Sequence, residues 1–348
     1  MHLHNFDFSK KILFHPEQLA AVRGGARPFP ITLEVDLTNI CNHDCSFCFY
    51  AEHLSKSNAS LDAALLLERL GEAKELGAKG VYFTGGGEPM AHRDFRRIME
   101  RAREIGFDVG LMTNGSLIRP RNIDSLVDSL QWIRVSMAGG TRETYRLVQG
   151  RDHFDRVIGN LQELSDLKTA RGSQLNVGVR ALVNEVNLHS MVRLAGKIKG
   201  FAVDYLQVAP DHLRPDAAAF WESHDTQAVF DEAECILKPH GIKLLTVGWA
   251  RHEDDLDVPR KCYAHHYKIA LTAEGDLTFC NMCRGMSRFY LGNINEKSFC
   301  EIWNSDATIE LESWIRPNNC GLFCKGMLIN LTVEQAMEPG ADMSPNFF

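Results

Sequence analysis

Three cysteines lie close together near the start of the chain. The stretch Val35–Tyr50 reads VDLTNICNHDCSFCFY and spaces Cys41, Cys45 and Cys48 as C-x3-C-x2-C. Thiolates this close on one loop can bind one face of an iron–sulfur cluster. A 4Fe–4S cube has more irons than this loop has thiols, so one iron would stay open to bind a substrate or cofactor directly. Phe47 offers an apolar wall beside it.

Two simpler interpretations of these thiols remain open from the spacing alone. Zinc normally takes four ligands from paired C-x2-C or Cys/His units, and here His43 would have to complete the set. The cysteines could also be a chance cluster. The strands and helices on either side of the loop are therefore needed to choose between an iron–sulfur cluster, a zinc site and a chance grouping.

Composition and charge narrow the class of protein. Of 348 residues, 45% are apolar and 24% charged, as in ordinary soluble globular proteins. A net charge of −7 argues against a nonspecific nucleic-acid binder. The N-terminal segment has no sustained apolar core, so we expect neither a signal peptide nor a membrane span. Ten cysteines without an export signal favour metal or catalytic use in a reducing compartment. We therefore expect a cytoplasmic protein without nucleic-acid or membrane partners.

Strand-like and helix-like segments alternate after an irregular lead-in over residues 1–30. We expect strands at 31–37, 81–83, 107–112, 132–137, 175–183 and 203–209, and helices at 61–77, 92–106, 121–130, 154–170 and 189–200. Strand–helix units with short connections predict an α/β fold with a parallel sheet and outer helices, a partial (β/α)6 barrel over residues 31–215. We expect a linker or helical segment at 216–255, a small second domain at 256–330 and a tail at 331–348.

Polar or glycine-rich loops follow four consecutive predicted strands. In α/β barrels the chemistry lies at the carboxyl ends of the strands. The cysteine loop follows the first strand, and the sequence Thr84–Pro89, TGGGEP, follows the second. Thr113-Asn114-Gly115 follows the third strand, and Ser136 ends the fourth. We therefore expect these loops on one rim of the barrel.

The cysteine spacing with its aromatic residue, together with the glycine-rich loop at the next strand end, resembles the radical S-adenosylmethionine (SAM) superfamily. The resemblance implies that Cys41, Cys45 and Cys48 bind a 4Fe–4S cluster whose open iron holds SAM. Arg180 is included among the cofactor contacts because an Arg fork suits a carboxylate, although a salt bridge at the barrel end is the alternative. Met137 and Ala138 depart from the acidic residue or Asn that often follows the family's serine. The residues that would contact SAM are Gly85, Gly86, Gly87, Glu88, Thr113, Asn114, Ser136 and Arg180.

A second set of cysteines lies beyond residue 255. Cys262, Gly275 and Cys280 are spaced C-x12-G-x4-C, and Cys320 and Cys324 form C-x3-C. This arrangement resembles the auxiliary iron–sulfur modules called SPASM and twitch domains, although a full SPASM domain has more cysteines. The resemblance implies that these four thiols hold one auxiliary 4Fe–4S cluster in a twitch-like domain. Structural zinc is the alternative, because four thiolates also satisfy zinc.

Three further cysteines have no place in either set. We expect Cys235, Cys283 and Cys300 to be small buried apolar residues. Cys283 is also a candidate cluster ligand, or a catalytic hydrogen-atom donor like the donor cysteine of radical SAM epimerases. His265 and His266 could line a substrate pocket, although core histidines are the commoner outcome.

The resemblance implies a particular reaction. A reduced cluster would cleave SAM to methionine and a 5′-deoxyadenosyl radical, which abstracts hydrogen from a substrate C–H bond, with oxidation, epimerisation or elimination as outcomes. We expect a small polar substrate (a sugar, aminocyclitol or nucleoside-like compound of natural-product biosynthesis) and a flavodoxin- or ferredoxin-type reductant. Only 40 residues precede Cys41, which we expect to be too few for the peptide-recognition domain of many peptide-modifying relatives. A peptide- or protein-modifying enzyme is the alternative, and a non-catalytic iron–sulfur or zinc scaffold or electron carrier is the alternative of a different class.

Overall fold

The computed structural model describes residues 9–51, 57–211, 220, 226–246, 259–315, 324 and 326–337. The chain divides into two compact units, which we describe separately. The first comprises mainly Asp36–Ala63 and Val81–Trp249. The second comprises mainly Asp7–Val35, Ala64–Gly80 and Ala250–Phe348.

The first unit is built on a sheet with strand order β2-β3-β4-β5-β6-β7. Its strands are β2 (Gly80–Thr84), β3 (Asp108–Thr113), β4 (Trp132–Ser136), β5 (Asn176–Val183), β6 (Tyr205–Pro210) and β7 (Lys243–Thr246). The pairs from β3 to β7 are all parallel. Parallel pairing puts the carboxyl ends of these strands at one edge, where the polar loops begin.

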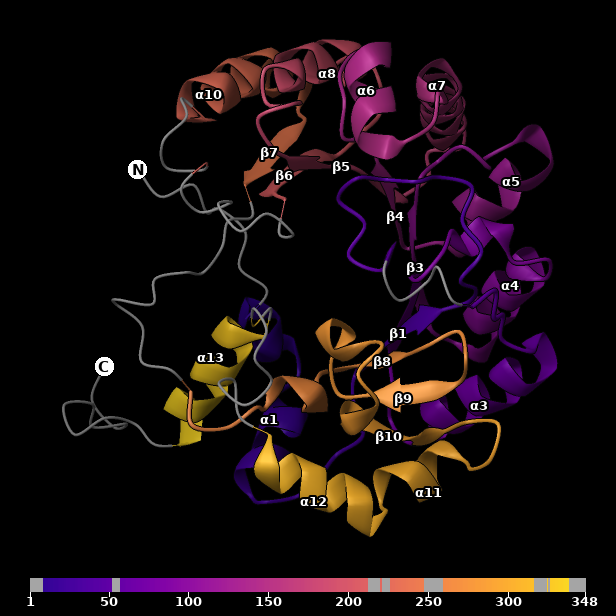
Figure 1. Ribbon diagram of the computed structural model, residues 1–348, viewed down its shortest axis with the longest axis vertical. Coiled ribbons are helices and arrows are strands. Elements are labelled where there is room, and N and C mark those ends of the chain that lie inside the picture. The colour runs from indigo at the N-terminus through magenta and orange to yellow at the C-terminus, as the bar shows by residue number, and fades with distance from the viewer. Residues whose placement is uncertain are drawn as a thin grey trace. The chain divides into compact units, whose positions relative to one another are not determined.

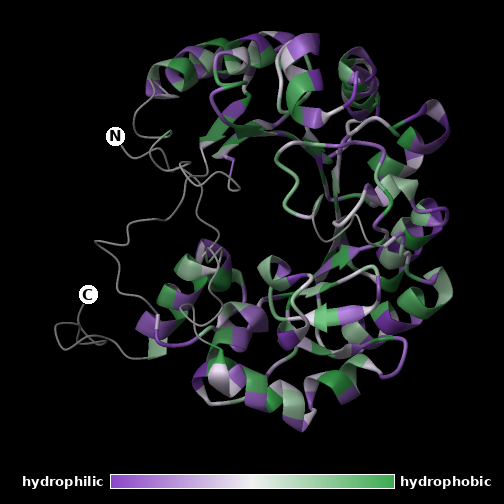
Figure 2. Ribbon diagram, viewed as in Figure 1, coloured by the Kyte–Doolittle hydropathy of each residue, from purple (hydrophilic) through white to green (hydrophobic). Residues whose placement is uncertain are grey.

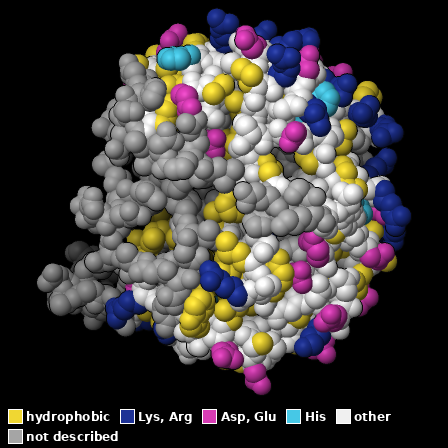
Figure 3. All heavy atoms as spheres, viewed as in Figure 1, with side chains coloured by type: hydrophobic (Ala, Val, Ile, Leu, Met, Phe, Trp, Pro, Cys, Tyr) yellow, Lys and Arg dark blue, Asp and Glu magenta, His cyan; other side chains and the backbone are white. Residues whose placement is uncertain are grey.

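Helices cover one face of this sheet, as Figure 1 shows. They are α4 (Phe95–Ile105), α5 (Pro120–Ser129), α6 (Arg142–Gln149), α7 (Phe154–Ala170), α8 (Ser190–Ile198) and α10 (Thr226–Leu237), with short 3-10 turns η2 (Pro89–Ala91) and η3 (Lys238–His240). In α4 the buried residues Phe95, Ile98, Met99 and Ala102 form one helical stripe. The banding of these helices in Figure 2 reflects that pattern, and Figure 3 shows Lys and Arg side chains over their outward side.

The other face of the sheet has room for large polar side chains. On β4, Ile133 and Val135 are buried, whereas Trp132, Arg134 and Ser136 are half-buried. Alternate residues of a strand point to opposite faces, so these three share the face that lacks helices. Gly110 and Gly178 leave space on neighbouring strands, because an added Cβ would lie 2.2 Å from the Trp132 indole and 2.1 Å from the Tyr205 ring.

The second unit contains the strands β10-β9-β8-β1 in that order. They are β1 (Thr32–Asp36), β8 (Lys268–Leu271), β9 (Asp276–Thr278) and β10 (Tyr290–Asn293); β1 pairs parallel with β8, and the other pairs are antiparallel. Its helices and 3-10 turns are η1 (Ser9–Phe14), α1 (Pro16–Arg23), α3 (Ala63–Glu75), η4 (Ala264–His266), η5 (Asn281–Cys283), η6 (Ser287–Phe289), α11 (Phe299–Trp303), α12 (Asp306–Trp314) and α13 (Met327–Met337). Ile12, Val22, Tyr267 and Val333 form a small core that joins η1, α1 and α13.

The predicted α/β fold with a parallel sheet and outer helices is confirmed. The stretch 216–255, expected to be a linker or helical segment, contributes α10 and also β7, which adds a strand beside β6. Within the described residues, no helix has both the length and the apolar character that crossing a bilayer requires.

Candidate active site

The three thiols of the cysteine loop lie near one another in the first unit. Burial is the main cause that raises the pKa of Cys45, and the neighbouring Cys48 and Cys41 thiols add to it. Burial also raises the pKa of Cys41 to about 11, with contributions from Glu88 and Cys48. Burial thus favours the protonated thiols, whereas coordination to a metal would remove their protons.

A 4Fe–4S cluster and a single zinc ion place their thiolates at different separations. Tetrahedral zinc with Zn–S bonds of about 2.3 Å would bring its sulfurs to about 3.8 Å from one another. Within the described part of the chain, no three cysteine sulfurs lie within 4.8 Å of one another. Thiolates that bind separate irons of a 4Fe–4S cube are spread further apart. The cluster at Cys41, Cys45 and Cys48 stays a prediction.

The glycine-rich loop after β2 lies directly against the entry to the cysteine loop. The Gly87 N–H donates to the Thr38 carbonyl at 2.8 Å, and the Glu88 N–H donates to the Ile40 carbonyl at 2.9 Å. A Cβ added at Gly87 would lie 2.1 Å from the Ile40 carbonyl oxygen. Only glycine therefore allows this approach of the two backbones.

Glu88 joins the glycine-rich loop to the loop after β3. Its carboxylate accepts hydrogen bonds from the Thr113 hydroxyl at 2.6 Å, the Asn114 N–H at 2.7 Å and the Met90 N–H at 3.2 Å. Burial raises the pKa of Glu88 while these three bonds oppose the rise. The structure thus brings Glu88, Thr113 and Asn114 together, and their contacts with SAM stay predictions.

Asn42 is a site residue that the sequence analysis missed. The Asn114 amide donates to the Asn42 side-chain oxygen at 2.8 Å, and the Asn42 amide donates to the Ser116 hydroxyl at 2.8 Å. Side-chain hydrogen bonds therefore join the cysteine loop to the loop after β3. The signal in the sequence was an amide residue directly after the first cysteine.

Gln149, at the end of α6, was also missed. Its side-chain oxygen accepts from the Ala138 N–H at 2.7 Å, and its amide donates to the Ser136 carbonyl at 3.3 Å. Its own carbonyl accepts from the Asp44 N–H at 3.4 Å and from the Cys45 thiol at 3.7 Å. Gln149 therefore couples the end of β4 to the second half of the cysteine loop.

Arg180 lies on β5 directly opposite Ser136 in the strand register. Its guanidinium donates to the Gln207 side-chain oxygen at 3.3 Å, and the Arg134 guanidinium donates to the same oxygen at 2.9 Å. The predicted contacts of Arg180 and Ser136 with the cofactor stay predictions.

Three of the four predicted auxiliary thiols converge in the second unit. Burial raises the pKa of Cys262, and the thiols of Cys280 and Cys324 contribute to the rise. The Met282 N–H donates to the Cys280 sulfur at 3.5 Å, and the Asn330 amide donates to the Cys324 sulfur at 3.7 Å. Amide donors of this kind stabilise thiolate ligands. Cys320 lies outside the described residues, so its predicted role is not addressed by these contacts.

The remaining cysteines, Cys235, Cys283 and Cys300, differ in their exposure to solvent. Cys283 is 2% exposed, as expected, and its N–H donates to the Cys280 carbonyl at 2.9 Å. The expectation of burial is wrong for Cys235 and Cys300, which are exposed, because they occupy the solvent side of helices α10 and α11. The role of Cys283 as a ligand or hydrogen-atom donor stays a prediction.

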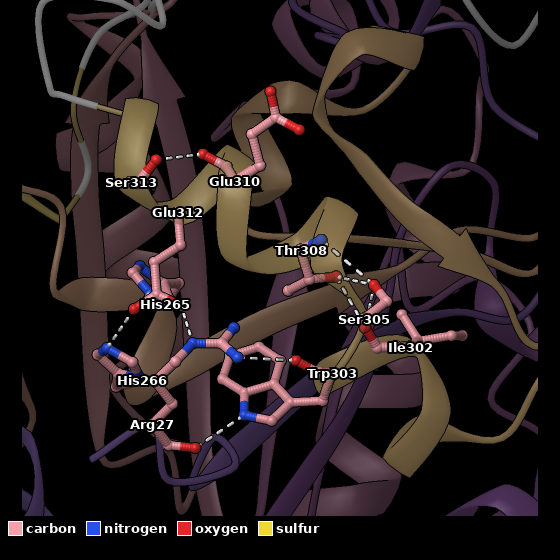
Figure 4. A network of polar contacts seen from close by, with 10 residues as sticks. All are labelled: Arg27, His265, His266, Ile302, Trp303, Ser305, Thr308, Glu310, Glu312 and Ser313. Carbon is pink, nitrogen blue, oxygen red and sulfur yellow. Dashed lines mark hydrogen bonds and ion pairs between the residues drawn. The ribbon is translucent and has the colours of Figure 1, made fainter. Parts of the chain in front are cut away.

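His265 and His266 are core residues that lie beside Glu312 and Arg27 (Figure 4). Their Nε2 atoms lie 3.4 and 3.3 Å from one oxygen of Glu312, and Arg27 pairs with the other oxygen. The two imidazoles and the carboxylate are close enough to hold a metal ion. The Arg27 charge on the same carboxylate disfavours a second cation, and burial lowers the pKa of His265 to about 4. We therefore interpret the group as a carboxylate that is paired with Arg27 and lies against two core histidines, not as a metal site.

Comparisons with known proteins agree with this geometry. A family model described as the radical SAM superfamily matches residues 35–198, and the SPASM model, described as an iron-sulfur cluster-binding domain, matches residues 262–325. A probable GTP 3',8-cyclase of Saccharolobus islandicus is 34% identical over 136 residues, 39% of this chain and 44% of that protein. The chain thus matches less than half the length of that relative. The uncharacterized protein MJ0804 of Methanocaldococcus jannaschii is 27% identical over 271 residues, 77% of this chain and 81% of that protein.

Solved structures share the fold at low identity. Streptococcus suis SuiB bound to S-adenosylmethionine has a TM-score of 0.68 at 18% identity, over 96% of this chain and 81% of that one. anSMEcpe with bound AdoMet has a TM-score of 0.60 at 18% identity, over 86% of this chain and 88% of that one.

The chain carries a radical SAM domain over residues 35–198. More particularly, a SPASM-type iron–sulfur cluster-binding domain follows it over residues 262–325. These domains imply a SAM-binding 4Fe–4S cluster, an auxiliary iron–sulfur cluster and SAM as cofactors, as predicted.

Proposed function

We propose that this protein reductively cleaves SAM and uses the resulting radical to abstract hydrogen from a C–H bond of a small polar substrate. The observation that carries the proposal is the convergence of Cys41, Cys45 and Cys48 with the Glu88 and Asn114 loops. When bound, a reduced cluster with an open iron supplies the electron that cleaves the sulfonium of SAM.

The chain's own residues would hold the cluster and orient SAM. Cys41, Cys45 and Cys48 would hold the cluster. The backbone of Gly85–Gly87, fixed by its bonds to the cysteine loop, would meet the amino group of SAM. Glu88 keeps the Thr113 and Asn114 loop beside it. Such prior fixation of the binding groups lowers the entropy cost of bringing the reactants together.

Cys262, Cys280, Cys320 and Cys324 would hold the auxiliary cluster. When bound, this cluster would supply an acceptor for the second electron of a net oxidation. We propose that a flavodoxin- or ferredoxin-type protein reduces the cluster at Cys41, Cys45 and Cys48. Cys283 would return hydrogen to the substrate if the outcome is epimerisation.

A peptide substrate is the second candidate. Two solved structures that share this fold have peptides in their descriptions: SuiB bound to precursor peptide SuiA, and anSMEcpe with the Cp18Cys peptide. The sequence relative named as a probable GTP 3',8-cyclase instead favours a small molecule.

The test is anaerobic incubation of the reconstituted, dithionite-reduced protein with SAM. We expect 5′-deoxyadenosine from the wild type and none from Cys45→Ala. The exposed Cys235→Ala is the matched control and should match the wild type. No 5′-deoxyadenosine from the wild type under strong reductant would favour a scaffold or electron carrier instead.

A further inference from the structure

A buried ion pair in the second unit joins strand β1 to the turn that begins at the auxiliary thiol Cys280. Glu34, on β1, is 2% exposed, and Arg284, one residue after Cys283, is 4% exposed. The Arg284 guanidinium donates to Glu34 Oε1 at 2.8 Å. The Lys268 ammonium of β8 donates to Glu34 Oε2 at 3.2 Å. The Glu34 carboxylate therefore faces two cationic groups.

Asn281 connects this carboxylate to the sulfur of Cys280. Its amide nitrogen donates to Glu34 Oε1 at 3.1 Å, and its side-chain oxygen lies 3.6 Å from the Cys280 sulfur. An ionised carboxylate only accepts hydrogen bonds, so Glu34 fixes the amide with its nitrogen toward β1 and its oxygen toward the sulfur. The Met282 N–H donates to the same sulfur at 3.5 Å. The polar surroundings of the Cys280 sulfur therefore depend on Glu34.

Stability alone is a poor reason for charges at this depth. Withdrawing an ion pair from water is costly, and apolar residues of similar volume often replace a buried pair without loss of stability. The neighbouring positions on β1, Leu33 and Val35, hold apolar side chains that are buried as deeply. Charge and hydrogen bonds near an iron–sulfur cluster have a further effect, because they set its reduction potential.

We propose that Glu34 is a positioning residue of the auxiliary site, which acts through Asn281 and Arg284 to set the reduction potential of the cluster that Cys280 helps to hold. Reduction adds negative charge to a cluster, so a nearby carboxylate lowers the potential and a nearby guanidinium raises it. The buried pair places both signs beside Cys280 and Cys283, where each offsets the other. The inference rests on the proposed function, because it requires the auxiliary cluster.

The experiment is an anaerobic redox titration of the reconstituted full-length chain, followed by electron paramagnetic resonance. All chains carry Cys45→Ala, so that only the auxiliary cluster titrates. We expect Glu34→Gln, which keeps an oxygen for Asn281 and Arg284 but removes the charge, to raise the potential. Arg284→Gln should lower it. Each shift should equal at least a tenfold change in the redox equilibrium constant, about 59 mV for one electron.

Three further variants separate this role from a structural one. The double variant Glu34→Gln/Arg284→Gln and the conservative Arg284→Lys should both stay within threefold of the wild-type redox constant. The matched control is Glu310→Gln, an exposed glutamate of the same unit, which should also leave the potential unchanged. Iron and sulfide per chain are measured on every variant and report whether the cluster is present.

Equal potentials in Glu34→Gln, Arg284→Gln and the control, at full iron content, overturn the inference. Shifts of the same sign in Glu34→Gln and Arg284→Gln also overturn it, as does loss of the cluster from both Glu34→Gln and Arg284→Lys, because the pair would then serve only the fold. A Cys45→Ala chain without iron contradicts the auxiliary cluster itself, and so distinguishes failure of the proposed function from failure of Glu34 alone.

Discussion

The Asn114 amide donates to the side-chain oxygen of Asn42 across 2.8 Å. One of these residues lies in the cysteine loop and the other follows β3, so their contact joins two segments more than 70 positions apart in sequence. Asn42 also donates to the Ser116 hydroxyl. The position of the predicted cluster relative to the predicted SAM contacts therefore depends on this amide pair.

Replacing Asn42 with Ala should loosen the cysteine loop. Leaving buried polar partners unsatisfied costs roughly 1–3 kcal/mol, which corresponds to about a 5- to 150-fold change in an equilibrium constant. We expect the dissociation constant for SAM to rise within that range, as measured by anaerobic equilibrium dialysis. Asn176→Ala, at an exposed position on β5, should bind SAM normally. Unchanged SAM binding by Asn42→Ala would show that the loop does not need this contact.

Gly87→Ala should displace the glycine-rich loop. Its Cβ would lie 2.1 Å from the Ile40 carbonyl oxygen, a backbone atom with no freedom to move aside. We expect SAM affinity to fall by at least about tenfold, a change of about 1.4 kcal/mol. Gly159→Ala is the matched control, because an added Cβ there meets nothing within 4 Å. If both glycine variants bind SAM alike, the close backbone approach is not functional.

Most strands and helices of the fold could be predicted from the sequence, but α6 and β7 could not. The approximate positions of β1 to β6 and of α3, α4, α5, α7 and α8 were predictable, because buried strands and one-sided helices have clear periodicities. Helix α6 was missed because it follows Gly139-Gly140 directly and runs for only eight residues; its start depends on the Thr141 cap. Strand β7 has only four residues, too few for a periodic pattern.

Part of the candidate site could likewise be predicted from the sequence, and part could not. Cysteine spacing and loops at strand ends are local features, so the thiols and the Glu88 and Asn114 loops were predictable as neighbours. Asn42, Gln149 and the pairing of Arg134 with Arg180 depend on which strands and loops become adjacent. No local pattern carries that information, since the contacts are made between segments distant in sequence.

Cys262→Ala should separate the two proposed clusters. We expect the iron content to fall by the share of the auxiliary cluster, because Cys262 is grouped with Cys280 and Cys324. Cleavage of SAM without substrate should continue at a reduced rate, since Cys41, Cys45 and Cys48 are intact. The measurements are iron and sulfide per chain and 5′-deoxyadenosine formation. Cys300→Ala, at an exposed cysteine, is the control. Full iron content in Cys262→Ala would contradict the auxiliary site.

Glu312→Gln should destabilise the second unit. The carboxylate pairs with Arg27 and lies 3.4 and 3.3 Å from the Nε2 atoms of His265 and His266, and removing one member of a buried ion pair costs about 3–5 kcal/mol. Because Glu312 is partly exposed, we expect about 2 kcal/mol, or a fall of roughly 4–8 °C in the melting temperature. The control is Glu104→Gln, which breaks an exposed ion pair on α4. Equal melting temperatures for the two variants would mean that the Glu312 network contributes little.

The proposed function requires an iron at Cys41, Cys45 and Cys48 that is open to SAM. Electron paramagnetic resonance of the dithionite-reduced protein, with and without SAM, tests this directly when Cys262→Ala removes the auxiliary signal. We expect SAM to shift the g values of the remaining 4Fe–4S cluster, and Cys45→Ala to abolish that signal. A spectrum that SAM leaves unchanged, or zinc in place of iron at these thiols, would contradict the account.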